Sequence, residues 1–162
     1  MEPTHKKRPS IKLTVRPSTV EDCEPVFNNL REDDSNEVQA VLGQSELAAL
    51  VFAWEQTPKP FAIVSDRGTA EAIFGVVPVE PGVGAVWLLG TDALVEARFQ
   101  FLRESRKWVE EVAQGYNLLF NYIDERNSVH QDWLRWTGFT FIARHEKYGV
   151  EERPFLEFVR IF

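Results

Sequence analysis

The chain has very little of the residue types that cross-link small proteins or bind zinc: its 162 residues include one cysteine and three histidines. Cys23 cannot form a disulfide within the chain, and one cysteine with so few histidines does not make a cysteine–histidine zinc cluster. No metal site is therefore predicted. The absence of a disulfide framework is typical of a reducing compartment, so we expect a cytoplasmic protein.

Long apolar runs are also missing. No stretch approaches the roughly 20 apolar residues that a membrane helix needs, and residues 1–10 carry basic side chains without the apolar segment of a signal peptide. The sequence thus predicts neither membrane insertion nor secretion. Residues 1–10 are predicted to be a flexible basic arm, and residues 11–162 a single domain, because no linker, repeat or low-complexity run follows.

The chain has fewer basic than acidic residues. Eighteen Lys and Arg residues stand against 25 Asp and Glu residues, for a net charge of −7. Since attachment to a phosphate backbone depends on Lys and Arg, nucleic acid is not expected as a partner. The arm carries +2, which leaves −9 for residues 11–162. An acidic body favours a protein partner with a basic surface.

Seven segments have the alternation or apolar composition of strands, at residues 11–16, 61–64, 70–79, 83–89, 117–123, 139–143 and 155–161. Helical spacing predicts two helices over 19–56, a long helix over 92–114, and a short helix that begins at Asn127 or Ser128 and ends before Gly138. The acidic run at 31–36 interrupts the apolar pattern. Residues 83–89 do not alternate, which indicates a central strand buried on both faces.

The resulting order is β-α-α-β-β-β-α-β-α-β-β. Three antiparallel strands followed by a strand–helix–strand crossover predict an α/β fold with a mixed, mostly antiparallel central sheet and helices on both faces. Cys23 falls on an apolar helix stripe and is predicted to lie in the core. The same reasoning predicts core positions for four tryptophans, Trp54, Trp108, Trp133 and Trp136.

One segment carries a more specific pattern. Residues 127–139, Asn-Ser-Val-His-Gln-Asp-Trp-Leu-Arg-Trp-Thr-Gly-Phe, combine an asparagine, an amphipathic helix and a closing Gly-Phe pair. With the element order, and with Val-Arg-Pro-Ser-Thr at residues 15–19, the chain resembles the GNAT (N-acetyltransferase) superfamily over nearly its whole length. The sequence of residues 133–139, Trp-Leu-Arg-Trp-Thr-Gly-Phe, further resembles small acetyltransferase-like proteins of short-tailed bacteriophages, including internal virion proteins.

The resemblance implies acetyl-CoA as cofactor, with the pantetheine arm along the strand at residues 86–90 and the pyrophosphate at the start of the next helix. It points to five cofactor-binding residues: Leu88, Leu89, Gly90, Thr91 and Asn127. The helix start departs from the family pattern, because it lacks the paired small residues, and Asp92 and Glu96 place negative charge where an anion would bind. A helix cap is an equally good interpretation of Asn127.

A catalytic acid or base is harder to assign. Many family members have a tyrosine four residues before the Gly of the Gly-Phe pair, where this chain has Leu134, which cannot donate a proton. Glu71, Asp92, Tyr116, Tyr122 and His130 are nearby substitutes by strand or helix placement, and Asp92 and His130 are the two that we predict to be catalytic. Their ordinary alternatives are a helix N-cap for Asp92 and a solvent-facing helix residue for His130.

Two functions therefore remain open. The first is a GNAT-like phage protein that acts on a bacterial host protein, as an acetyl-CoA-dependent N-acetyltransferase with a degenerate pyrophosphate loop. The second is a non-enzymatic interaction protein, either an inhibitor of a host protein or an internal virion component, that keeps the fold without acetyl transfer. The element order supports the first, and the altered helix start with Leu134 supports the second.

Overall fold

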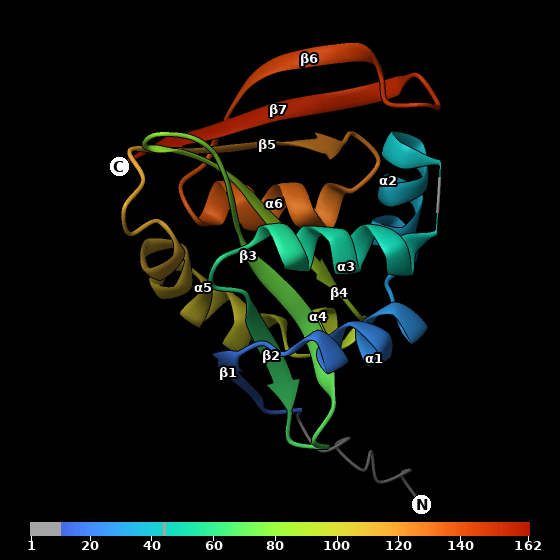
Figure 1. The fold of residues 1–162 in the computed structure, drawn as a ribbon, viewed down its shortest axis with the longest axis vertical. Coiled ribbons are helices and arrows are strands. Elements are labelled where there is room, and N and C mark those ends of the chain that lie inside the picture. Colours follow the sequence, from blue (N-terminus) through green and yellow to red (C-terminus); the bar gives the residue numbers. More distant parts are fainter. Residues whose placement is uncertain (1–10, 44) are drawn as a thin grey trace, which may run out of the picture.

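A computed structural model describes residues 11–43 and 45–162, so the predicted arm at residues 1–10 lies outside the described residues. One seven-stranded sheet has the order β1-β2-β3-β4-β5-β7-β6 (Figure 1). Its strands are β1 Leu13–Pro17, β2 Phe61–Ser65, β3 Ala70–Glu80, β4 Val83–Gly90, β5 Leu118–Asp124, β6 Thr140–Tyr148 and β7 Arg153–Ile161. Neighbours are antiparallel except β4 and β5, which run parallel. The predicted mixed sheet, with the apolar strand at its centre, is confirmed.

Helices cover both faces of the sheet. They are η1 Val20–Asp22, α1 Cys23–Asn28, α2 Glu32–Leu42, α3 Glu46–Gln56, α4 Ala93–Glu96, α5 Arg98–Val112 and α6 Ser128–Trp136. Side chains of α1 and α3 pack with Ile73 and Leu89 on one face, and side chains of α4, α5 and α6 pack on the other. Helix α2 lies beside the ends of β5 and β7 (Figure 1). Among the described residues, no helix is long and apolar enough to cross a membrane.

Period-2 alternation decides which β3 and β4 side chains enter which layer. Phe74 and Leu88 face α5, whereas Ile73 and Leu89 face α1 and α3. Cys23 is buried in the second layer, as predicted. Trp136 corrects the prediction that all four helical tryptophans lie in the core: it is 43% exposed, because it falls at the edge of the α6 stripe.

Two helical predictions are wrong in detail. The acidic run at 31–36 does not break the helix, because residues 32–36 form the first turns of α2, where the helix dipole favours Glu32, Asp33 and Asp34. The single helix expected over 92–114 is divided into α4 and α5 at Ala97, whose backbone (φ −100°, ψ 28°) leaves the helical region. Both differences lie next to the candidate site.

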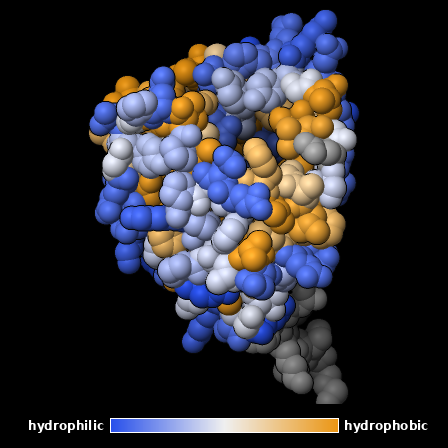
Figure 2. Space-filling model, viewed as in Figure 1, coloured by the Kyte–Doolittle hydropathy of each residue, from blue (hydrophilic) through white to orange (hydrophobic). Residues whose placement is uncertain are grey.

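The far end of α2 is held by the turn between β6 and β7. The backbone N–H groups of Val150 and Glu151 donate to Val41 O and Ala40 O over 3.2 and 3.1 Å. Exposed hydrophobic side chains in this region include Leu42 and Val150. Figure 2 shows hydrophilic side chains over much of the visible face and a hydrophobic area on its right side, over α2 and α3.

Candidate functional site

The two central strands separate along their length. Parallel pairing joins β4 to β5 only from Val83–Ala85 to Leu118–Phe120, and the strands diverge beyond it. A cavity of about 350 Å³ fills the space between them. Its walls are mainly apolar and include Val86, Leu88, Trp108, Tyr122 and Leu134. The sheet thus contains an open V whose base is Ala85 and whose mouth is the carboxyl end of both strands.

The main chain of β4 faces this V at alternate residues. Thr91 N–H donates to Glu71 O on the β3 side, so the antiparallel alternation turns the peptide groups of residues 86, 88 and 90 toward β5. Asn121 Nδ2 donates to Val86 O across the gap over 2.8 Å. The Leu88 peptide therefore faces the cavity, whereas the Leu89 peptide faces β3 and its side chain packs in the α1–α3 layer.

Helix α2 closes the mouth of the V with a buried carboxylate, Asp34, and a half-buried one, Glu37. Asp34 Oδ2 accepts from Gly90 N–H over 2.9 Å, and Glu37 Oε1 accepts from Asp124 N–H over 3.0 Å, so the helix bridges the ends of β4 and β5. The Asn127 side chain joins both, because its Nδ2 donates to Asp34 Oδ1 and Glu37 Oε2 over 3.3 and 3.2 Å. We call Asp34, Glu37 and Asn127, with His130, the mouth cluster.

Burial shifts the titration of the mouth cluster. Burial raises the pKa of Asp34 to about 6, although the nearby Arg31 and the Gly90 N–H oppose the shift. Burial and then the charge of Asp34 raise the pKa of Glu37 to about 8. Burial and then Arg31 lower the pKa of His130 to about 4, so the imidazole is neutral at pH 7. Its Nδ1 is buried without a hydrogen-bond partner among the described residues.

Arg31 sits at the same mouth with imperfect pairing. Its side chain is only 4% exposed, and its backbone N–H donates to Gly90 O over 2.9 Å. The guanidinium lies 3.4 Å from both Asp33 and Asp34 and 4.0 Å from Asp92. It also lies 5.3 Å from the ring centre of Trp133. One buried cation is thus shared among three carboxylates and an indole ring.

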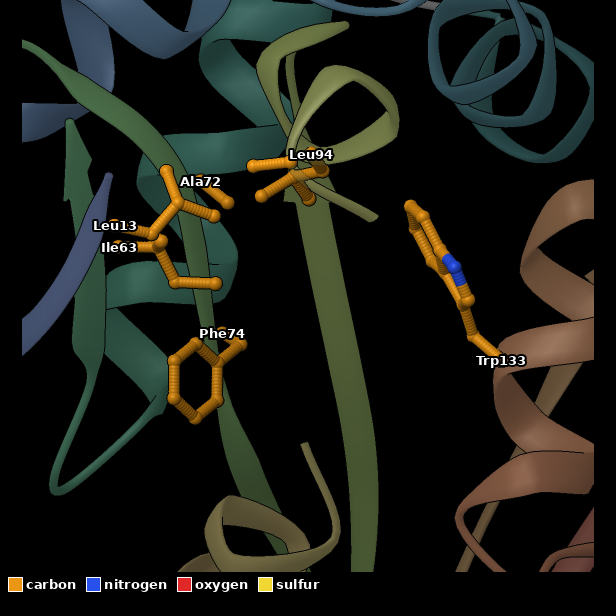
Figure 3. Close-up of a cluster of buried hydrophobic side chains, with 7 residues drawn as sticks. Leu13, Ile63, Ala72, Phe74, Leu94 and Trp133 are labelled. Carbon is orange, nitrogen blue, oxygen red and sulfur yellow. The ribbon is translucent and has the colours of Figure 1, made fainter. Parts of the chain in front are cut away.

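Trp133 closes the space between α6 and α4. Its side chain projects from α6 toward Leu94 (Figure 3), and both residues belong to one buried cluster that also contains Phe74. The ring of Phe101 from α5 packs against the indole with 4.5 Å between ring centres. A side chain of this chain therefore fills the gap beside the start of α4.

The seven-stranded sheet with a parallel β4–β5 pair, an open V between them and helices on both faces is the GNAT acetyltransferase fold. Similar solved structures include a Sinorhizobium meliloti GNAT phosphinothricin acetyltransferase in complex with acetyl-CoA (TM-score 0.68, 14% identity, 93% of this chain and 88% of that one). They also include the Vibrio fischeri ribosomal-protein-S5-alanine acetyltransferase (0.66, 15%, 92% of each). A third is the aminoglycoside acetyltransferase AAC(6')-Ib in complex with ribostamycin and coenzyme A (0.67, 14%, 93% of each).

At these identities the likeness establishes the fold alone. No protein-family model matches the chain, and no curated protein matches it by sequence. The resemblance to phage proteins therefore stays a prediction. Because acetyl-CoA is bound in one of these similar structures, the fit of this chain's residues to acetyl-CoA can be tested.

A pyrophosphate does not fit the start of α4. Every backbone N–H from residue 90 to 97 except that of Asp92 already donates to an oxygen of this chain. Asp92 and Glu96 add negative charge there, each opposing an anion by roughly 0.3–1 kcal/mol. The start of the longer α5 lies elsewhere, because Gln100 bonds both backbone groups of Leu13 on β1, at the edge of the sheet. The β4 peptide groups that face the cavity could pair with a pantetheine arm, but residues 90–97 offer a pyrophosphate no free N–H group except that of Asp92.

The structure divides the predicted site residues into two groups. Gly90, Asn127 and His130 meet at the mouth cluster, and Leu88 lines the cavity. The solvent-facing alternative for His130 is wrong, because its ring lines the cavity. Leu89 also lines the cavity, although its peptide group faces β3, whereas Thr91 and Asp92 do not line it.

Thr91, and not Asp92, provides the side-chain cap at the start of α4. The Thr91 hydroxyl accepts from Ala93 N–H over 3.3 Å and donates to Glu71 Oε2 over 2.6 Å. Asp92 makes no side-chain cap bond, and its side chain is 82% exposed. Asp92 thus stands at the N-cap position of α4, as the alternative predicted, but its side chain does not cap the helix. Asn127 does cap α6, because its Oδ1 accepts from His130 N–H over 3.4 Å, and its Nδ2 remains available to the carboxylates.

Sequence reasoning missed Arg31, Asp34 and Glu37. They lie in or beside the acidic run at 31–36, which has the composition of a solvated loop. The one available signal was the i, i+3 spacing of Asp34 and Glu37, which places both carboxylates on one helix face. Nothing local indicates that this face is turned toward the protein.

Proposed function

We propose that this chain uses the GNAT scaffold for binding to another protein and not for acetyl transfer from acetyl-CoA. The observation that carries the proposal is the occupied set of backbone N–H groups at residues 90–97. A pyrophosphate bound there would have to replace internal hydrogen bonds, and it would meet the acidic Asp92 and Glu96 instead of cations. The scaffold is therefore retained while its anion site is closed.

The charge of the domain supports a partner with a basic surface. Residues 11–162 carry −9, which attracts cationic surfaces and repels acidic ones. The likeness of residues 133–139 to short-tailed phage proteins suggests the setting. We propose a cytoplasmic or virion-associated phage protein whose partner is a bacterial host protein or a virion component.

Calorimetric titration with acetyl-CoA tests the first half of this proposal. We expect no heat of binding at millimolar ligand. The Asp92→Asn/Glu96→Gln double variant should behave in the same way, because removing the charges leaves the N–H groups occupied. Saturable binding by the wild-type chain would overturn the proposal, and binding only by the double variant would show that charge alone excludes the cofactor.

Purification of the tagged chain from lysate of a bacterial host tests the second half. We expect a stoichiometric complex that weakens as salt is raised, since screening reduces the attraction between opposite charges. The mass of the captured partner should be unchanged. A partner that carries one added acetyl group for each modified amine would contradict the binding interpretation.

Acetyl transfer is the second candidate, and one observation favours it. Glu37 lines the cavity, and burial raises its pKa to about 8, which suits a group that takes a proton from an amine nucleophile. This candidate predicts thiol release from acetyl-CoA in the presence of an amine acceptor. Glu37→Gln should abolish that release, whereas Glu110→Gln, on the exposed side of α5, should retain it.

A further inference from the structure

Three side chains of the mouth cluster have the composition of a metal site. One carboxylate oxygen each from Asp34 and Glu37 and one ring nitrogen of His130 lie within 4.8 Å of one another. Asp34 and Glu37 share a face of α2, and His130 comes from α6 on the other side of the mouth. Two helices distant in sequence therefore present three potential ligands to one point.

A ring nitrogen of His130 provides independent evidence for a ligand at this point. Its Nδ1 is buried, and no described residue bonds it. Buried polar side-chain atoms nearly always have a partner, so an orphan nitrogen needs an explanation. A neutral imidazole offers a lone pair on one ring nitrogen, and this is the form in which histidine binds metals.

The charges at the mouth point in the same direction. Asp33, Asp34 and Asp92 surround the Arg31 guanidinium, and Glu37 lies beside Asp34. Of these, Asp33 and Asp92 are 40% and 82% exposed, so only Asp34 and Glu37 are turned away from water. Two ionised carboxylates beside one guanidinium leave one negative charge unbalanced, and a divalent cation reduces the cost of keeping that charge away from water.

Hydrogen bonds hold the two carboxylates from behind. Gly90 N–H fixes Asp34, Asp124 N–H fixes Glu37, and the Asn127 amide bonds both. Asp34 Oδ1 also accepts from Arg31, but Asp34 Oδ2 and both Glu37 oxygens accept one of these bonds each and keep a second lone pair for a cation. Such outer contacts orient the ligands of metal sites.

We propose that Asp34, Glu37 and His130 bind a divalent transition-metal cation, with Zn²⁺ as the best match to two carboxylates and one imidazole. Ligand distances to zinc are about 2.0–2.2 Å, so ligand atoms that now lie within 4.8 Å of one another move closer together when the ion binds. Because Glu37 and His130 line the cavity, the free coordination position faces it.

This inference does not depend on the proposed function. It concerns a cation that a protein-binding scaffold or an acyltransferase could equally hold. Sequence reasoning weighed only cysteine and histidine as zinc ligands, and so it could not find a site built from two carboxylates and one histidine.

Calorimetric titration of the full, chelator-treated chain with Zn²⁺ tests the proposal. We expect one bound ion for each chain. Glu37→Gln and His130→Phe should each weaken binding by at least about tenfold, since each removes one ligand. Co²⁺ used as a spectroscopic substitute should give visible absorption in the wild-type chain that both variants lose.

The control is His145→Gln. His145 Nε2 lies 2.9 Å from Glu157 in a half-exposed pair on β6 and β7, which is the other described histidine–carboxylate pair of the chain. This variant should bind Zn²⁺ as the wild-type chain does. In Glu37→Gln the amide nitrogen cannot accept one of the two bonds that Glu37 takes from Asp124 N–H and Asn127 Nδ2, so this variant should melt lower without metal. His130→Phe breaks neither bond, so it shows whether metal binding is lost in a chain that keeps these contacts.

Two results would overturn the proposal. One is the absence of saturable binding of Zn²⁺, Mn²⁺ or Co²⁺ to the wild-type chain. The other is binding that survives in Glu37→Gln and His130→Phe but disappears in His145→Gln, which would place the ion on the outer strands. Because the titrations use the metal alone, neither result bears on the acetyl-CoA and partner experiments.

Discussion

Asp34 on α2 accepts a hydrogen bond of 2.9 Å from the backbone N–H of Gly90, the last residue of β4. This contact couples an acidic helix to the point where the central strands separate. The splay of β4 from β5 leaves main-chain groups without strand partners, and buried groups of this kind must bond elsewhere. In this chain, α2 provides the acceptors.

Removal of the Asp34 carboxylate should destabilise the fold strongly. Asp34→Ala leaves Gly90 N–H without an acceptor and Arg31 without its most buried partner, and breaking such a buried pair costs about 3–5 kcal/mol. Urea unfolding at neutral pH measures the loss. The matched control is Asp33→Ala: the Asp33 side chain is 40% exposed and also contacts Arg31, and its loss should cost about 1 kcal/mol or less. Equal losses would refute a special role for Asp34.

Two tryptophans three residues apart on α6 should differ in importance. Trp133 is buried among Leu94 and Phe101, so Trp133→Ala should cost about 3–5 kcal/mol through the cavity that it leaves. Trp136 is partly exposed and held by Arg106 at 3.9 Å from the ring centre, so Trp136→Ala should cost about 1 kcal/mol. Thermal and urea unfolding of both variants provide the comparison.

The turn that holds the end of α2 should not tolerate a side chain. Gly149 has φ +70°, and a Cβ there would lie 2.4 Å from Ala40 O, so Gly149→Ala must displace the turn and its bonds to α2. Gly68 has a similar φ of +79° but open space around it, so Gly68→Ala carries only the backbone strain of about 1–2 kcal/mol. Gly149→Ala should be clearly the less stable variant in urea. Similar stabilities would mean that the turn is not held against α2.

Lowering the pH should reduce the free energy of unfolding, because Asp22 becomes protonated. Burial would raise the pKa of Asp22, but hydrogen bonds from Arg16, the Thr19 N–H and Ser18 outweigh it and lower the pKa below its ordinary 3.8. The folded chain then binds fewer protons than the unfolded chain, so this stabilisation is present above pH 3.8 and is lost as the pH falls through the folded value.

Asp22→Asn removes the titrating group and provides the comparison. The stability difference between the wild-type chain and Asp22→Asn should be constant near neutrality and shrink below pH 3.8, as measured by urea midpoints over the acid range. A stability difference that does not change with pH would show that Asp22 stabilises the fold through packing and neutral hydrogen bonds and not through its charge.

Much of the fold could be predicted because its signals are local. Alternation located the strands, and the long apolar run at 83–89 identified the central strand. Asn127 and Gly138 marked the two ends of α6, because a capping side chain and a glycine with positive φ act within one turn of the helix. Trp136 shows the limit of such reasoning. Periodicity identifies the apolar stripe of α6, but it does not show how much of that stripe other elements cover.

The mouth cluster could be predicted only in part. Asn127 and Gly90 follow from the resemblance of residues 127–139 and of the central strand to GNAT proteins, and His130 follows from its place on the predicted helix. Asp34 and Glu37 do not, because their acidic surroundings are typical of a solvated surface. Their burial depends on the separation of β4 from β5, which no local pattern encodes.

The amino-acid sequence by itself determined the order of the strands, the central position of β4 and the acidic character of the body, because each depends on residue type and spacing along the chain. Only the tertiary structure decided that α2 turns Asp34 and Glu37 inward and that the N–H groups after β4 are occupied. Parts of the chain some 90 residues apart meet there, as the bond from Asn127 to Asp34 shows. The physical reason is that unpaired main-chain groups at the splay require acceptors, and the folded chain places those carboxylates within reach.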